Sequence, residues 1–438
     1  MYGETKTSSE FVEKEKYSLT PEENLKVHSK EFCRDIIKVI DNIYFAIGFG
    51  ASNCILIEGD NGSVLVDTLE SVERAEELKS EFKKISAKPI KAIIYTHSHK
   101  DHVGGASVFI EDNPEIISRK PFGGQLGPNA VSAILGKRAK RQFGVDLSPE
   151  ERLNVGIGGN YYGGQRDGFV PPTRQFSEEK LTLTIEGIYL ELISAPGETD
   201  DQLFVWLPEQ KVLISADNYY KSFPNLYAIR GTPYRDIGVW VETIDKMIDL
   251  NAQYLLPGHS RTIIGQENIR ETLTNYRNAI DFVLQETLKC VNQGLTPDEL
   301  VSAVKLLPGL AEKPYLQEFY GTVQWSVRSI FTGYLGWFDG NPTNLNPLTP
   351  KTEAEHMAKL AGGSENLYHE AQNALVREDF QWAMQLADYL IILEEYMLEA
   401  KQIKIQSCRA LARKQTSACG RNYYFVYARE MEQELYSK

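Results

Sequence analysis

The chain has 438 residues, a formal net charge of −13 and 42% hydrophobic residues. This length predicts two or three domains, and the composition is that of a globular protein with a sizeable core. The negative charge argues against binding to nucleic acid, whose phosphates would be repelled. It leaves open a small anionic substrate, because metal ions and local arginines set the potential of a cleft.

The cysteines and the N-terminus bear on the cellular compartment. The five cysteines are scattered, odd in number and without CxxC spacing, which favours reduced thiols over a disulfide framework. The first 32 residues contain no apolar segment typical of a secretory signal, and no segment approaches the roughly 20 apolar residues of a membrane span. We therefore expect a cytoplasmic protein without a membrane span.

Three regions follow one another along the chain. Residues 1–38 form a polar lead-in, in which Thr20-Pro21-Glu22-Glu23 is a capping box that predicts the start of a short helix. From 39 to 267, short apolar runs alternate with helical patterns, as in an α/β layered core. The predicted helix of this region is 71–85, and the predicted strands are 43–49, 54–58, 63–67, 90–95, 181–185, 189–193, 203–207, 212–215 and 254–256.

A long insertion, 112–178, interrupts the α/β region. Insertions of this length usually form a lid or a wall of a binding site, and we expect this one to line a substrate pocket. Its glycine-rich segment 156–164 lacks the preceding strand and the GK[ST] ending of a phosphate-binding loop, and its basic run 137–141 is interpreted as a solvated helix face. The apolar side chains expected in the pocket are Phe143, Leu153, Tyr161 and Phe169.

From residue 268 onward the pattern becomes helical. Apolar residues recur at three- and four-residue steps between Ile269 and Val291, and Gly294 is a typical helix end. The segment 315–338 is crowded with aromatic residues, which fits either a domain core or a dimer interface. The stretch 365–437 predicts three or four helices in short hairpins, without a repeat of fixed period. The sequence thus predicts an all-α region over 268–438.

A histidine-rich segment carries the main functional signal. It reads THSHKDHVGG and directly follows the predicted strand 90–95. Imidazole nitrogens and carboxylate oxygens at a strand end suit zinc, and the same ligand types also suit iron or manganese. A polar loop rich in histidine by chance is the alternative, which is disfavoured because the HxHxDH spacing serves two ions. The candidate ligands in this segment are His97, His99, Asp101 and His102.

Three further candidate ligands follow later predicted strands. Glu198 comes after strand 189–193, in the turn Pro196-Gly197-Glu198-Thr199. Asp217 comes after strand 212–215, and His259 comes after strand 254–256. An acidic residue after a strand is more often a solvated turn than a ligand. The order of the three, downstream of the histidine segment and each at a strand end, favours a shared metal site.

The motif THxHxDHxGG resembles the signature of the metallo-β-lactamase superfamily, whose fold is an αββα sandwich with a dinuclear zinc site. Most of the superfamily has histidine where this chain has Glu198, so the glutamate is a departure. Together with NLYAIRG at 225–231, Arg235-Asp236, and YLGWFDGNPTNLNP at 334–347, it makes the chain closely resemble the alkyl/aryl sulfatases of that superfamily. The resemblance covers about residues 40–430.

This resemblance implies a specific architecture and metal site. The metallo-β-lactamase sandwich, an α+β fold, would occupy 39–267, followed by a helical alkylsulfatase dimerisation domain over 268–438, and the chain would form a homodimer. Asp217 would bridge two zinc ions, and Asp101 and Asp217 would be the catalytic residues, acting with a metal-bound hydroxide. The remaining ligands would be His97, His99 and Glu198 for one ion, and Asp101, His102 and His259 for the other.

The implied reaction is hydrolysis of an alkyl sulfate ester, such as dodecyl sulfate, to alcohol and inorganic sulfate. Sulfate binding calls for guanidinium forks, although one of the arginines could instead form a structural ion pair with Asp236 or Glu242. Asn53 is a further candidate contact. The alternatives are another hydrolase of the same fold (a thioesterase, lactonase or phosphoesterase) or a non-catalytic binding protein. The residues expected to bind sulfate are Arg230, Arg235, Asn225 and Tyr227.

Overall fold

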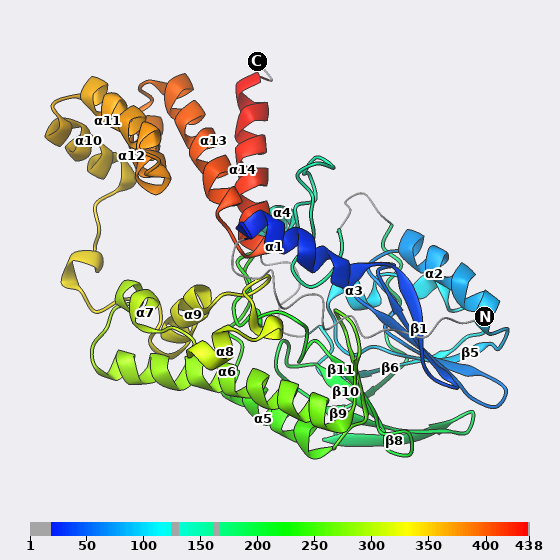
Figure 1. The fold of residues 1–438 in the computed structure, drawn as a ribbon. Coiled ribbons are helices and arrows are strands. Elements are labelled where there is room, and N and C mark those ends of the chain that lie inside the picture. The colour runs from blue at the N-terminus through cyan, green and yellow to red at the C-terminus, as the bar shows by residue number, and fades with distance from the viewer. Residues whose placement is uncertain (1–18, 124–130, 161–165, 437–438) are drawn as a thin grey trace.

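The computed structural model describes residues 19–123, 131–160 and 166–436 (Figure 1). Two β-sheets face each other in the N-terminal half, and helices form the C-terminal half. The capping box at Thr20 begins helix α1, Pro21–His28, as predicted. Tyr161, one of the expected pocket residues, lies outside the described residues.

The first sheet has seven strands in sequential order. Strands β1 to β4 pair antiparallel, and β4 to β7 pair parallel, with α2, Val72–Ile85, crossing between β4 and β5. Three strands of this sheet, β1, β6 and β7, were not predicted from the sequence. The strands are β1 Asp35–Ile40, β2 Ile43–Ile47, β3 Cys54–Glu58, β4 Ser63–Val66, β5 Ile90–Ile94, β6 Glu115–Arg119 and β7 Arg174–Phe176.

The second sheet has six strands in the order β13-β12-β11-β10-β9-β8. Strands β11 and β12 pair parallel and are joined by α5, Ile237–Asp249, whereas the other neighbours pair antiparallel. Every residue of β10 and β11 is buried, as expected of strands covered on both faces. The strands are β8 Lys180–Ile185, β9 Ile188–Ser194, β10 Leu203–Leu207, β11 Val212–Ala216, β12 Tyr254–Pro257 and β13 Ile263–Ile264.

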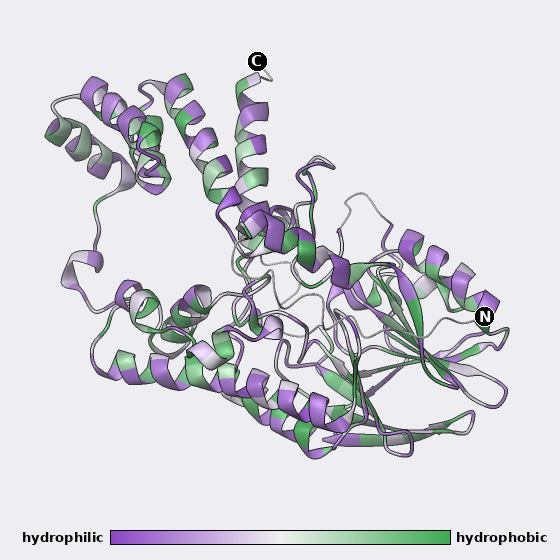
Figure 2. Ribbon diagram, in the orientation of Figure 1, coloured by the Kyte–Doolittle hydropathy of each residue, from purple (hydrophilic) through white to green (hydrophobic). Residues whose placement is uncertain are grey.

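Three apolar cores hold the layers together. One lies between the sheets and joins residues such as Phe45 and Leu203. A second packs Leu78 of α2 against the outer face of the first sheet, and a third packs Trp240 of α5 against the outer face of the second. Figure 2 shows apolar residues concentrated on the strands and polar residues on the outer surface of α2. The αββα sandwich expected from the sequence is therefore confirmed.

The helical half has two parts with separate cores. Helices α6 and α9 share the core of the second sheet, so the apolar core does not divide where the sequence pattern changes at 268. Helices α10 to α13 contribute to a core of their own. The helices of this half are α6 Gln266–Asn292, α7 Pro297–Ala303, α8 Pro308–Ala311, α9 Val323–Leu335, α10 Pro350–Ala361, α11 Ser364–Val376, α12 Phe380–Leu393, α13 Met397–Arg413 and α14 Ala418–Tyr436.

The insertion and the C-terminal helix meet beside the sandwich. Helix α4, Ser132–Phe143, lies in the insertion and packs on α14, with Arg141 paired to Glu430. Ser417, just before α14, donates a hydrogen bond to the carbonyl of Tyr320 at 2.7 Å. The last part of the chain thus supports the region that the insertion forms.

Within the described ranges, no helix combines the length and the apolar character needed to cross a bilayer.

Acid is expected to destabilise the fold through His28. Burial lowers the pKa of this histidine to about 4, although its Nε2 lies 2.8 Å from the carbonyl oxygen of Gly156. Because the unfolded chain takes up this proton from about pH 6.5, the free energy of unfolding should fall by roughly 3 kcal/mol between pH 6.5 and pH 4. His28→Gln should remove this part of the pH dependence of the free energy of unfolding, which denaturant titrations at several pH values would measure.

The matched control for this prediction is His369→Gln. The side chain of His369 is exposed, so this substitution should keep the wild-type dependence of the free energy of unfolding on pH. An unchanged pH dependence of the free energy of unfolding in His28→Gln would show that the buried histidine does not titrate as predicted.

Candidate metal centre

The seven predicted ligands come from four segments that each follow the carboxyl end of a strand. The histidine segment runs from the end of β5 into the short helix α3, Lys100–Val103. Glu198 follows β9, Asp217 follows β11, and His259 follows β12. Since β5 belongs to the first sheet and the other three strands to the second, the cluster lies where the two sheets meet.

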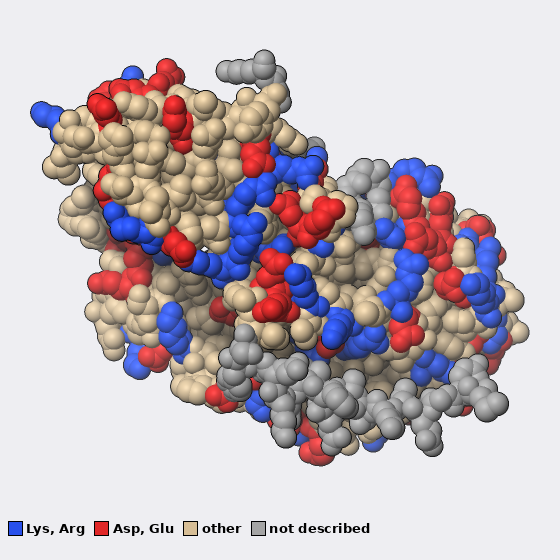
Figure 3. All heavy atoms as spheres, turned by 45° about the horizontal axis from the view of Figure 1, so that its top comes forward, with Lys and Arg blue, Asp and Glu red and all other residues tan. Residues whose placement is uncertain are grey.

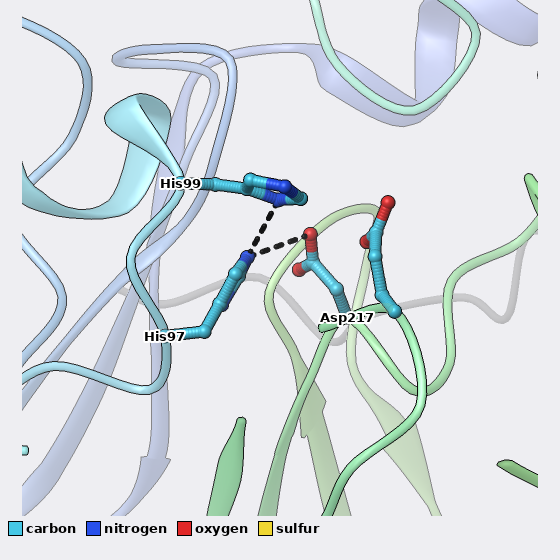
Figure 4. A group of neighbouring side chains, drawn as sticks. His97, His99 and Asp217 are labelled. Carbon is cyan, nitrogen blue, oxygen red and sulfur yellow. Dashed lines mark hydrogen bonds and ion pairs between the residues drawn. The ribbon is translucent and has the colours of Figure 1, made fainter. Parts of the chain in front are cut away.

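The structure brings these side chains into two groups. Within each group, one potential ligand atom of every residue lies within 4.8 Å of the others. Figure 4 shows His97, His99 and Asp217 pointing toward one another, with 3.0 Å between His97 Nε2 and His99 Nδ1. The groups are His97, His99, Glu198 and Asp217 on one side, and Asp101, His102 and His259 on the other.

Asp217 stands between the two groups. Its Oδ2 lies 3.6 Å from His97 Nε2 in the first group, and 3.4 Å from His102 Nε2 and 3.2 Å from His259 Nε2 in the second. Asp101 Oδ2 lies 3.6 Å from His102 Nε2 and 3.4 Å from His259 Nε2. Asp217 is therefore the carboxylate that lies close to both groups, and its role as a bridge between two ions stays a prediction.

The donor set fits a pair of divalent metal ions. His102 Nε2 and His259 Nε2 face each other at 3.3 Å, both buried, with the carboxylates of Asp101 and Asp217 beside them. Among the described residues, Glu198 Oε2 and Asp217 Oδ1 are buried oxygens without a hydrogen-bond partner. Buried lone pairs of this kind are costly unless a cation or donor satisfies them, and imidazole and carboxylate are common zinc ligands.

The electrostatics of the protein without metal show how tightly these groups are coupled. Burial opposes protonation of His102, but the carboxylates of Asp217, Asp67 and Asp101 together raise its pKa well above the ordinary value. Burial lowers the pKa of His99 well below the ordinary value, with His97 adding to the effect. Carboxylates thus oppose the effect of burial at His102, whereas His99 lies beside another imidazole.

Asp67 is a residue that the sequence reasoning missed. It follows β4, and its Oδ2 lies 2.6 Å from His102 Nδ1, the ring nitrogen that faces away from the cluster. The backbone N–H of Thr96 donates to Asp67 Oδ1 at 2.9 Å, and the Thr96 hydroxyl donates to Oδ2 at 2.8 Å. A carboxylate behind a histidine ligand fixes its tautomer and orientation. The available signal was its position, since it ends a buried strand as the ligands do.

Asp67→Asn is expected to weaken metal binding about 10- to 100-fold, because the amide holds the His102 ring less well than a carboxylate does. Competition with a chelator of known affinity would measure the loss. Asp60→Asn, at an exposed carboxylate in the β3–β4 turn, is the control and should leave metal affinity unchanged. Wild-type affinity in Asp67→Asn would mean that this carboxylate does not support the ligand.

The cluster of candidate ligands opens into a cavity of about 560 Å³. The cavity is lined by ligands from both groups, including His99, Asp217 and His259. The exposed Lys100 and Lys140 also line it. Figure 3 shows Lys and Arg side chains, with Asp and Glu side chains among them, between the C-terminal helices and the sandwich. The apolar wall of the cavity is formed largely by the insertion, through Leu135, Ala139, Phe143, Val145, Val155 and Ile157.

The predicted pocket residues divide between this cavity and other places. Phe143 lines the cavity, as predicted from the sequence. Phe169 is 43% exposed and lies beside Tyr95 and Phe122 instead. Leu153 is half-buried and is not among the described residues that line the cavity.

Arg230 is the predicted sulfate contact that reaches the cavity. Its Nη2 lies 3.5 Å from His99 Nε2, and its guanidinium lies 5.8 Å from the ring centroid of Phe143. The Nη1 atom is buried without a partner among the described residues. Gln142, which sequence reasoning missed, is buried in α4 and accepts a hydrogen bond from the backbone N–H of Arg230 at 2.9 Å. Helix α4 therefore fixes the backbone from which this arginine extends.

The other predicted sulfate contacts lie elsewhere in the structure. Arg235 pairs with Glu198 at 2.8 Å, rather than with Asp236 or Glu242, and it does not line the cavity. Neither Asn225 nor Tyr227 is among the described lining residues. The amide of Asn53 is buried and donates to the carbonyls of Pro257 and Ser260, on either side of His259.

Thr199 and Glu70 are among the polar residues of the cavity lining that the sequence reasoning did not single out. Thr199 directly follows Glu198, and its hydroxyl is buried without a partner among the described residues. Glu70 accepts a hydrogen bond from the N–H of Ala51 at 3.0 Å, and burial raises its pKa to about 7. The adjacency of Thr199 to a predicted ligand was a usable signal, whereas nothing local marks Glu70.

Fold and site together define a member of the metallo-β-lactamase superfamily. The family described as "Metallo-beta-lactamase superfamily" matches residues 47–259, and the family described as "Alkyl sulfatase dimerisation" matches residues 296–434. Within that superfamily, the chain belongs to the alkylsulfatases, which are sulfuric ester hydrolases. It is 38% identical over 397 residues to the linear primary-alkylsulfatase of Pseudomonas sp. (strain ATCC 19151), covering 87% of this chain and 74% of the relative.

More distant relatives and solved structures agree with this assignment. The alkyl/aryl-sulfatase BDS1 of Saccharomyces cerevisiae is 29% identical over 412 residues, covering 91% of this chain and 64% of the relative. The solved structure of the stereoselective inverting sec-alkylsulfatase Pisa1 from Pseudomonas sp. matches with a TM-score of 0.85 at 28% identity, covering 91% of this chain and 65% of that chain. The chain thus spans less than two thirds of the length of each of these two proteins.

Proposed function

We propose that this chain is a zinc-dependent hydrolase that cleaves linear alkyl sulfate esters, such as dodecyl sulfate, to an alcohol and inorganic sulfate. The observation that carries the proposal is the cavity itself. At one place it offers Arg230, with an unpartnered guanidinium nitrogen, next to the ligand His99. Along the insertion it offers an apolar wall. An alkyl sulfate is an amphiphile that needs both.

The polar part of the cavity suits a sulfate group in both charge and geometry. A guanidinium presents a planar fork of donors that matches two sulfate oxygens, and its charge is not lost at any physiological pH. The hydroxyl of Thr199 is a second unpartnered donor in the same cavity. Lys100 and Lys140 also line the cavity, and together with two bound zinc ions they would offset its lining carboxylates and favour the approach of an anion.

The apolar wall suits a linear hydrocarbon chain. Leu135, Ala139 and Phe143 recur at four-residue steps along α4, so they share one face of that helix, and all three line the cavity. Burial of each methylene against such a surface stabilises the complex by up to about 0.8 kcal/mol. A longer alkyl chain should therefore lower KM until the chain extends past the wall.

Each of the two groups would hold one zinc ion, and the two ions would share the carboxylate of Asp217. Two bound zinc ions would supply an activated water molecule near neutral pH and a Lewis acid for the charge that develops on the ester. The protein contributes the orientation of substrate and ligands: Arg230 holds the anion beside His99, and Asp67 holds the ring of His102. Asp101 and Asp217 would be the catalytic carboxylates in this proposal, because they would hold the ions that supply this water.

We also propose that the chain forms a homodimer through its helical half. Between α9 and α10 the chain runs in an extended linker that leaves large apolar side chains exposed, and the dimerisation family match includes this linker. Exposed patches of this kind commonly mark protein–protein interfaces. The side chains are Trp337, Leu345 and Leu348 in the linker and Leu335 at the end of α9, and Trp337 is 71% exposed.

The deciding experiment is release of inorganic sulfate from dodecyl sulfate by the purified chain, with a chelator and with zinc added back. We expect release that the chelator stops and zinc restores. Metal analysis should find about two zinc ions per chain. A panel with a thioester, a lactone and a phosphate monoester tests the other reactions of the fold. Turnover of one of these, without sulfate release and with metal bound, would contradict the proposed substrate class while leaving the metal site intact.

A further inference from the structure

We infer that Arg235 is a positioning residue for the metal ligand Glu198, and that it is not a contact for the sulfate group. The inference rests on the proposed metal-dependent function. The two side chains form a buried ion pair, with 2.8 Å between Arg235 Nη1 and Glu198 Oε1 and less than 5% of either side chain exposed. The pairing concerns one oxygen of the carboxylate, and it leaves Oε2 without a partner among the described residues.

The position of Arg235 relative to the cavity separates it from Arg230. Glu198 lines the cavity and Arg235 does not, so Arg235 meets the site through the carboxylate. Arg230 lines the cavity directly. Two arginines five residues apart thus face different partners: one faces the space that a substrate would occupy, and the other faces the back of a ligand.

The electrostatic need for such a partner comes from the ligand set. Glu198 is buried and shares a small volume with the carboxylate of Asp217. A buried carboxylate requires a counter-charge or hydrogen-bond donors to remain an ionised ligand. A guanidinium supplies both, and its planar geometry fixes the direction of the oxygen that it leaves free.

The backbone around Arg235 is fixed well enough to hold that direction. Arg235 Nη1 also donates to the carbonyl of Asn225, whose own N–H donates to the hydroxyl of Tyr220 at 2.8 Å. The next residue, Asp236, is the N-cap of α5, and its side chain accepts from the N–H of Val239 at 3.1 Å. Arg235 is therefore held at both its head group and its backbone, as a residue that orients a ligand must be.

Two other nitrogens of Arg235 support the alternative, in which this arginine contacts the sulfate group. Arg235 Nε and Nη2 are buried without hydrogen-bond partners among the described residues, and unpartnered donors could meet an anion. The two interpretations predict different consequences of removing the charge. A positioning role predicts loss of metal, whereas a sulfate contact predicts intact metal binding with a raised KM.

The test compares Arg235→Met, Glu198→His and the double variant, with metal content and chelator competition as the readouts. We expect Arg235→Met to bind the metal of the first group about 10- to 100-fold more weakly and to retain about one zinc ion per chain at limiting free metal. Combining it with Glu198→His should restore binding relative to Arg235→Met, because a neutral imidazole leaves no uncompensated charge when the arginine is removed. Arg230→Met is the matched control, and it should keep the wild-type metal content while raising KM.

Thermal melts of each variant report whether it folds, and Arg235→Lys serves if Arg235→Met does not. The lysine variant keeps the charge without the fork, so it should bind the first-group metal more weakly than wild type. Full metal binding in the folded Arg235 variants, together with a raised KM, would overturn the inference. So would a metal loss that Glu198→His does not relieve. Since metal content is measured without substrate, absence of alkylsulfatase activity in the wild type would refute the proposed function and leave this result readable.

Discussion

Asp217→Ala is expected to lower kcat/KM for an alkyl sulfate at least about 10³-fold, which corresponds to roughly 4 kcal/mol of transition-state stabilisation. Its Oδ2 lies close to histidines of both groups, 3.2 Å from His259 Nε2 and 3.6 Å from His97 Nε2. Loss of this carboxylate removes the shared ligand and leaves buried imidazoles without their counter-charge. Steady-state kinetics and metal analysis on the same preparation would measure both effects.

The control for this variant is Asp41→Ala, which removes a fully exposed carboxylate from the β1–β2 turn. It should match the wild type in activity and in metal content. Circular dichroism should show that the Asp217 variant keeps its secondary structure, because the three apolar cores do not include the metal cluster. Full activity in a folded Asp217→Ala protein would end the proposed mechanism.

Arg230→Ala is expected to lower kcat/KM by about 10²- to 10³-fold, mainly through KM, and to leave the metal content unchanged. The expected size follows from removing a desolvated charge partner, which costs about 2–5 kcal/mol. Arg230 is the predicted arginine that lines the cavity, and its Nη1 has no partner among the described residues. The kinetic constants for dodecyl sulfate, measured with metal-saturated protein, would show the change.

Arg230→Lys refines this prediction, because lysine keeps the positive charge but lacks the planar fork. It should bind the substrate better than the alanine variant and less well than the wild type. A metal content that falls with Arg230→Ala would mean that this arginine supports His99, from which it lies 3.5 Å away, rather than the substrate. An unchanged KM would remove it from the proposed sulfate site.

The convergence of the candidate ligands could be predicted because their signal is local. Each of them follows a buried strand, and an apolar run that ends in a polar residue able to bind metal is visible in one stretch of sequence. Glu198 is the clearest case: its turn carries an acidic residue where a solvated turn was the ordinary interpretation, and the structure places it in one group with His97 and His99. Strand ends at one edge of a sandwich converge, so order along the chain was enough.

The roles of the supporting residues could not be predicted, because Gln142 has no local pattern and the position of Asp67 after a strand does not identify its partner. Gln142 contributes through its contact with the backbone of Arg230, 88 positions away along the chain. Asp67 contributes through the ring of His102, 35 positions away. A glutamine in a basic helix and an aspartate after a strand are ordinary residues until the fold brings them to their partners.

The sequence by itself determined the layered sandwich, the change to helices after it and the seven candidate ligands. Apolar periodicity fixes which face of an element is buried, and ligand chemistry is carried by residue type. Only the tertiary structure decided between Arg230 and Arg235, which are similar in sequence and differ in what faces them. It also decided that α4 forms the cavity wall and that α14 supports it. Contacts between segments distant in the chain depend on how the layers pack, and this packing leaves no pattern within either segment alone.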